Sequence, residues 1–151
     1  MASMMTRLTT WMGVNSQAND LWIVASTVYG ESRGEPDFGK RAVAAVIKNR
    51  QLFHPRWRDK TLAEISRTPK QFSCWDPDDP NYAKLLALTI ATPDFAPCLQ
   101  ATIDILSGTV ASPVARSTHF HTTAMHPVPG WAVGKTPHIV LGNHVFYQGI
   151  A

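Results

Sequence analysis

The segment VYGESRGEP, residues 28–36, is the part of this sequence that determines the expected fold. It follows apolar residues at helical spacing, and we therefore expect a helix over residues 20–31 with Asn19-Asp20 as its cap. Gly30 and Gly34 surround Glu31 and indicate tightly packed backbone at the end of that helix. The residues that form the apolar stripe are Leu21, Val24, Ala25 and Val28.

Helices are expected to predominate up to about residue 112. Each has its own signal: an apolar stripe, a capping box, an N-terminal proline or a glycine stop. After the helix at 20–31, one helix is expected over residues 37–52, and a short one begins with the capping box at Thr61–Glu64. Another is expected from Asp79-Pro80 to about residue 91. The last contains Leu99, Ile103 and Leu106 and ends before Gly108.

The last forty residues instead have the character of strands. Ser117–Thr123 alternates and is rich in threonine and aromatic residues, and residues 138–141 and 144–148 flank Gly142-Asn143, a two-residue hairpin turn. We therefore expect an α+β domain, mainly helical with a small C-terminal β-hairpin section. A chain of 151 residues fits one domain, over residues 19–151, after a flexible leader over 1–18.

The composition excludes several classes of protein. With 44% hydrophobic and 17% charged residues and a net charge of +3, the chain is an ordinary globular protein. Its basic residues are dispersed and no nucleic-acid motif occurs, so we expect no nucleic-acid partner. We also expect the protein to be a monomer. No apolar run approaches about 18 residues, so no membrane insertion is expected. Cys74 and Cys98 have no CxxC spacing; we expect two buried free thiols, with one disulfide bridge between them as the alternative.

Glutamate occurs only three times, as Glu31, Glu35 and Glu64. Glu64 completes the capping box, and Glu35, before Pro36, is suited to the start of the next helix. Glu31 has no such role, and burial at a glycine-bounded helix end would raise its pKa and keep it protonated. A protonated carboxyl can act as general acid on a glycosidic oxygen. A glutamate at a helix end is more often a surface residue, so this pattern alone leaves both readings open.

Several separated blocks resemble the SleB-like cell wall hydrolases, a family that includes spore-cortex-lytic enzymes and related bacterial and phage wall-degrading proteins. The resemblance covers roughly residues 20–148 in matching order. One departure is His119-Phe120-His121, where many members carry a tyrosine-rich strand. The blocks are residues 28–36, 42–50, 71–75 (QFSCW), 118–121 (THFH), 129–132 (PGWA) and 139–147 (IVLGNHVFY).

This resemblance implies a lysozyme-like fold and cleavage between N-acetylmuramic acid and N-acetylglucosamine in peptidoglycan. Glu31-Ser32 also resembles the Glu-Ser pair of soluble lytic transglycosylases, which favours Glu31 over Glu35 as the catalytic carboxyl. A glycan site needs aromatic faces and polar groups, although each aromatic taken singly is more often a core residue. The predicted substrate-binding residues are Tyr29, Ser32, Gln71, Phe72, Ser73, Trp75, His119, Phe120 and Tyr147, with Trp131 as a further aromatic candidate.

We therefore expect a lytic transglycosylase that forms 1,6-anhydro-N-acetylmuramic acid and needs no cofactor or metal. A muramidase is the first alternative, with a base among Asp76, Asp78 and Asp79. A zinc-dependent amidase or peptidase using His119 and His121 is the second, and a non-catalytic glycan-binding module is the third. No export signal is visible, so we expect a phage endolysin released by a holin, or a lysin carried in a virion.

Overall fold

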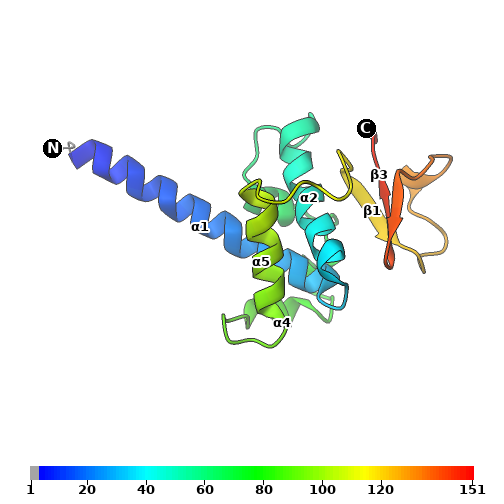
Figure 1. The fold of residues 1–151 in the computed structure, drawn as a ribbon, viewed down its shortest axis with the longest axis horizontal. Coiled ribbons are helices and arrows are strands. Elements are labelled where there is room, and N and C mark those ends of the chain that lie inside the picture. The colour runs from blue at the N-terminus through cyan, green and yellow to red at the C-terminus, as the bar shows by residue number, and fades with distance from the viewer. Residues whose placement is uncertain (1–3) are drawn as a thin grey trace.

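The computed structural model describes the backbone of residues 4–151 and the side chains from Asn15 onward. Within these residues, helices are followed by a small antiparallel sheet, as Figure 1 shows. The elements in chain order are α1 Met4–Ser32, α2 Asp37–Phe53, α3 Leu62–Ser66, η1 Ser73–Trp75, α4 Tyr82–Leu86, α5 Phe95–Leu106, β1 His119–Thr122, η2 Gly130–Ala132, β2 Ile139–Leu141 and β3 His144–Tyr147, where η marks a short 3₁₀ helix.

Helix α1 begins much earlier than predicted. It starts at Met4, so Asn19-Asp20 lies inside the helix, and the Asp20 carboxylate accepts a hydrogen bond from the Ala63 N–H at 3.0 Å. The N-terminal half of α1 extends away from the other elements (Figure 1), and residues 15–19 are exposed. A stretch of helix that is exposed, as residues 15–19 are, has no core-facing stripe, so periodicity does not reveal it. The division into a leader over 1–18 and a domain over 19–151 stays a prediction.

The core forms where the C-terminal half of α1, α2 and α5 pack together (Figure 1). Every residue in Ala42–Ile47 of α2 is buried, which makes α2 the central helix. The prediction of a helix over 37–52 is confirmed, since α2 ends one residue later. Val24 and Val28 of α1 and Phe95 of α5 are fully buried against it. Cys74 and Cys98 are buried free thiols, as predicted.

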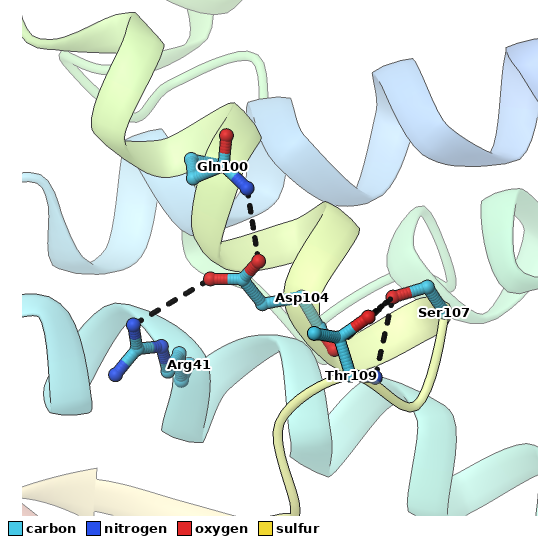
Figure 2. Close-up of polar contacts among 5 residues, drawn as sticks. All are labelled: Arg41, Gln100, Asp104, Ser107 and Thr109. Carbon is cyan, nitrogen blue, oxygen red and sulfur yellow. Dashed lines mark hydrogen bonds and ion pairs between the residues drawn. The ribbon is translucent and has the colours of Figure 1, made fainter.

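Polar contacts on the outer side of this core link α2 to α5. Figure 2 shows that the Asp104 carboxylate accepts hydrogen bonds from Gln100 at 2.9 Å and from Arg41 of α2 at 3.5 Å. Ser107 and Thr109 bond to each other just after the last turn of α5. Gly108 has a φ of 78°, which confirms the predicted glycine stop. Because Arg41 is partly exposed, this ion pair contributes at most about 1 kcal/mol to stability.

The two short helices gave one correct and one wrong prediction. The Thr61–Glu64 capping box is present, with both reciprocal hydrogen bonds. The predicted helix from Asp79-Pro80 to residue 91 is wrong, because α4 covers only Tyr82–Leu86. The Asp79 carboxylate instead accepts the Asn81 N–H at 2.8 Å, which makes a turn rather than a helix cap.

The sheet has the strand order β1-β3-β2. The predicted hairpin is confirmed: β2 and β3 pair antiparallel across Gly142-Asn143, with Leu141 opposite His144. Strand β1 adds to the other side of β3, with Phe120 opposite Phe146. Phe146 is fully buried in the main core, so the sheet and helices form one α+β domain. Within the described residues, no helix is both long and apolar enough to cross a membrane.

Candidate active site

Glu31 lies in the last turn of α1 and is half-buried at the wall of a cleft. The cleft has a volume of about 340 Å³ and lies between α1, the segment around η1 and β1 with its following loop. Residues from three distant parts of the sequence therefore meet around one carboxyl group. They are Glu31, Lys70, Gln71, Ser73, Asp76, Phe120, His121, Thr122, Met125, Pro129 and Trp131.

The surroundings of Glu31 favour its protonated form. Burial raises the pKa of the Glu31 carboxyl above its usual value, and the nearby negative charges of Asp79 and Asp76 raise it further. The Cys74 side chain and the Cys74 N–H, which lies 3.3 Å from Glu31 Oε1, both bond to Glu31 and oppose this shift, but burial outweighs them. Glu31 is therefore suited to donate a proton to a ligand in the cleft.

Gly30 allows Cys74 to approach Glu31. A β-carbon added at Gly30 would lie 2.6 Å from Cys74 Cβ and 2.8 Å from its Sγ, so no other residue fits without a shift. Burial also raises the pKa of the Cys74 thiol, which keeps a neutral group beside Glu31. The expectation of close packing is thus met at Gly30, but not at Gly34, where an added β-carbon would meet nothing within 4 Å.

A second hollow of about 380 Å³ begins on the other side of Glu31. Its lining is polar, with Arg33, Asn81, Asn143 and His144, whereas the first cleft contains Phe120 and Trp131. Glu31 lines both hollows and so lies where they meet. A polymer bound in both would place an internal bond, rather than an end, beside this carboxyl group.

Glu35 also lines this second hollow, but its carboxyl group is engaged by other residues. It is buried, and its Oε1 accepts the Asn143 N–H at 3.1 Å while lying 3.8 Å from His144 Nδ1. An added β-carbon at Gly142 would come within 2.5 Å of Glu35 Oε2, and one at Gly39 within 2.8 Å of Glu35 Cβ. Glu35 therefore connects the α1–α2 turn to the β2–β3 turn, a larger structural role than the sequence indicated.

The predicted substrate-binding residues divide into two groups. Gln71, Ser73 and Phe120 line the cleft with Glu31, as does Trp131. The others do not line it: Trp75 is half-buried with its indole N–H on Thr27 Oγ1, and the remaining five are buried, although Ser32 lines the second hollow. Their contact with substrate stays a prediction. The buried five are Tyr29, Ser32, Phe72, His119 and Tyr147.

Arg50 is an important residue that the sequence reading did not single out. It is buried between the rings of Trp57 and Phe72, at 4.4 and 4.9 Å from their centroids. Its Nε donates to the Thr118 carbonyl at 2.7 Å and its Nη1 to Gln71 Oε1 at 3.2 Å. Burial lowers its pKa to about 9, which leaves it cationic at neutral pH. Arg50 thus positions two walls of the cleft, and only its place beside Asn49 in a matching block could have pointed to it.

The histidines of β1 are occupied by other contacts. His121 bonds through Nε2 to Tyr147 Oη at 2.9 Å and through Nδ1 to the Thr122 carbonyl at 2.8 Å. His119 Nδ1 bonds to Thr118 Oγ1, and burial lowers the pKa of His119 to about 4. Among residues whose side chains the structure describes, no three His, Cys, Asp or Glu are grouped so as to hold a metal ion.

A larger hollow of about 610 Å³ lies elsewhere, beside the end of α2 and the last residues of the chain. Its lining includes Arg56 and Arg116 but no carboxyl side chain. Its one titratable acid–base side chain is His54, whose pKa is lowered by burial, so the cleft with the protonated Glu31 is the better candidate for general acid catalysis.

Comparison with known proteins identifies the family of this chain. The family described as Cell Wall Hydrolase matches residues 34–147, a segment that begins just after Glu31. The spore cortex-lytic enzyme of Halalkalibacterium halodurans is 33% identical over 128 residues, or 85% of this chain and 34% of that protein. A spore cortex-lytic enzyme of Bacillus cereus is 66% identical over 32 residues, 12% of its length. The chain thus spans about a third or less of these relatives.

Two solved structures share the fold. The catalytic domain of the Bacillus cereus SleB protein has a TM-score of 0.69 and 26% identity, and the match covers 87% of this chain and 91% of that one. The catalytic domain of the germination-specific lytic transglycosylase SleB from Bacillus anthracis has a TM-score of 0.68 and 26% identity, covering 86% and 94%. The predicted lysozyme-like α+β fold and SleB-like resemblance are confirmed, and this chain belongs to the cell wall hydrolase family.

Proposed function

We propose that this chain cleaves the glycan strands of bacterial peptidoglycan between N-acetylmuramic acid and N-acetylglucosamine as a lytic transglycosylase, with Glu31 as its catalytic residue. The observation that carries the proposal is a half-buried carboxyl group of raised pKa, positioned where two hollows meet. The relative from Bacillus anthracis, whose catalytic domain shares this fold, is a lytic transglycosylase.

The reaction needs one carboxyl group in two roles. Protonated Glu31 gives its proton to the glycosidic oxygen as the bond to C1 of the muramic acid breaks and positive charge develops there. The Glu31 carboxylate then takes the proton from the 6-hydroxyl of the same sugar while that oxygen bonds to C1. The 6-hydroxyl is tethered to the reacting carbon, which favours its attack over that of free water.

A muramidase remains the second candidate because Asp76 lines the same cleft as Glu31. Hydrolysis by water uses a second carboxylate as base or nucleophile across the sugar ring. Asp76 is the best placed of the three aspartates that the sequence offered, since Asp78 is exposed and Asp79 bonds to the Asn81 backbone.

The products distinguish the two reactions. Purified walls digested by the protein should release muropeptides about 18 mass units lighter than hydrolysed ones, because internal ring closure does not add the water molecule that hydrolysis adds. Their muramic acid ends should resist borohydride reduction. Reducible ends from the first time point would show hydrolysis, and Asp76→Asn should then abolish the reaction.

We also propose that the protein acts on the wall as a phage endolysin or a virion-associated lysin. Expression in a host cell with and without a co-expressed holin tests the endolysin role. Lysis only with the holin supports the endolysin role, and lysis without it contradicts that role. A zinc-dependent amidase would lose activity on dialysis against EDTA and recover it with zinc, whereas we expect full activity after dialysis.

A further inference from the structure

The outer edge of β1 faces the cleft that contains Glu31. Strand β1 ends the strand order β1-β3-β2, so one of its edges has no neighbouring strand. The Thr123 N–H donates to the Asn143 carbonyl at 2.8 Å, in register with the β1–β3 ladder. Hydrogen-bonded and non-hydrogen-bonded pairs alternate along an antiparallel ladder, so Phe120 and Thr122 direct their backbone groups away from β3.

Phe120 thereby presents an unused donor and acceptor to the cleft. The Thr122 carbonyl is already taken, by the ring of His121 and by the Met125 N–H. The N–H and C=O of Phe120 have no hydrogen-bond partner among the residues that the structure describes, and Phe120 lines the cleft with Glu31. A half-buried pair of this kind, at a strand edge, is a template for a further strand.

The geometry of this pair favours a peptide over a sugar substituent. In a strand, the N–H and C=O of one residue point the same way, and one extended amino-acid residue matches both. An N-acetyl group is a single trans amide whose N–H and C=O point in opposite directions, so it can satisfy only one of them. In peptidoglycan, the extended peptide nearest the cleaved bond is the stem attached to muramic acid.

Lys70 adds a charge of the right sign. It is exposed at the same cleft and makes no ion pair with any carboxylate of the described side chains. Its φ of 63° is in the left-handed region, which costs a residue other than glycine about 1 kcal/mol. Strain of this kind is often retained where it positions a functional side chain. Stem peptides carry free carboxylates, which an unpaired ammonium group attracts.

We propose that the free edge of β1 at Phe120 and the Lys70 side chain bind the stem peptide of the glycan strand being cleaved. Phe120 pairs through its N–H and C=O with the first residue of the stem, and Lys70 binds a stem carboxylate. The inference rests on the proposed function and adds a specificity to it: the protein selects muramic acid that carries a peptide.

The first test compares one glycan preparation before and after an amidase has removed its stems, with products counted by mass spectrometry. The full chain should show a kcat/KM about a hundredfold lower on stripped glycan, the order expected for losing two to three hydrogen bonds. Equal values on the two substrates would overturn this inference but not the proposed function. Cleavage of neither substrate would refute the proposed function, and the inference with it.

The second test changes the protein. Lys70→Met keeps the side-chain length and the same backbone strain, so its fold should be retained and is checked by its melting temperature. It should reduce the preference for peptide-bearing over stripped glycan several-fold. Lys84→Met, an exposed lysine on α4, is the matched control and should keep the full preference. A preference that Lys70→Met leaves at the wild-type ratio would overturn the role of Lys70.

The third test addresses the backbone pair. A synthetic muropeptide chain that is N-methylated at the first stem residue lacks the N–H that would donate a hydrogen bond to the Phe120 carbonyl. Its kcat/KM should fall about tenfold against the unmethylated chain. No change on methylation would overturn the pairing at Phe120.

Discussion

Glu31 and Glu35 differ in environment although they lie only four residues apart, at the end of α1 and in the turn that follows it. The Glu31 carboxyl lines both hollows, bonds among the described residues only to the backbone N–H and the side chain of Cys74, and has a raised pKa. The Glu35 carboxyl lines the second hollow but is buried, accepts the Asn143 N–H, and lies against Gly142 and His144. The comparison indicates that a carboxyl left with few partners is available for chemistry, whereas one enclosed by partners holds the fold together.

The largest expected effect is on catalysis. Glu31→Gln removes the proton donor without changing the shape of the side chain, so the rate of glycan cleavage should fall by a factor of at least ~10²–10⁴. The rate is measured by muropeptide release. Glu64→Gln, at the exposed capping box of α3, is the matched control and should retain its rate. A greater loss in Glu35→Gln than in Glu31→Gln would reverse the assignment.

The next effect is on stability. Gly142→Ala places a β-carbon 2.5 Å from Glu35 Oε2 at a φ of 55°, so it should lower the free energy of unfolding by about 2–4 kcal/mol, the sum of strain and overpacking. Gly134→Ala has a similar φ of 73° but meets nothing within 4 Å, and should cost only the strain. Urea denaturation of both variants isolates the contact with Glu35. Equal losses would show that Glu35 moves aside freely.

Glu35→Gln should have a smaller effect of the same kind. The amide oxygen of the new side chain still accepts a hydrogen bond from the Asn143 N–H, but this bond is weaker than one to a carboxylate. We therefore expect the free energy of unfolding to fall by about 1–2 kcal/mol. Cleavage measured well below the melting temperature should keep most of its rate. A rate loss without any loss of stability would place Glu35 in the reaction.

The smallest effect is a dependence on pH. The folded-state pKa of Glu31 is raised above its unfolded value, so its contribution to stability is full at low pH and is lost as pH rises through the folded-state value. Glu31→Gln should therefore gain stability relative to the wild type as pH rises above about 4.5. Burial also lowers the pKa values of His119 and His144, but both proteins share these groups, so they cancel in the difference.

The same ionisation should appear in the rate. Cleavage by the wild type should decline on the alkaline side as Glu31 loses its proton, with a midpoint above the ordinary glutamate pKa. A stability difference that does not change with pH, together with a rate that falls only at acid pH, would contradict a protonated Glu31.

Part of the fold was predictable because its signals are local. The capping box at Thr61–Glu64, the glycine stop at Gly108 and the Gly142-Asn143 hairpin each depend on a few adjacent residues, and all three are present. The early start of α1 and the short α4 were not predicted. An exposed helix shows no apolar period, and the Asp79 side chain can form a turn as readily as a cap.

The sequence by itself determined that Glu31 was the glutamate without a local structural role and that the chain resembles the cell wall hydrolases. Only the tertiary structure showed that Gln71, Phe120 and Trp131 share a cleft with Glu31 while Phe72 and Tyr147 are buried. Gln71 is half-buried and Phe72 is buried because the backbone at Phe72 is extended, which turns successive side chains to opposite sides. Arg50 and Glu35 acquire their roles through partners 68 and 108 residues away, a distance across which local sequence carries no signal.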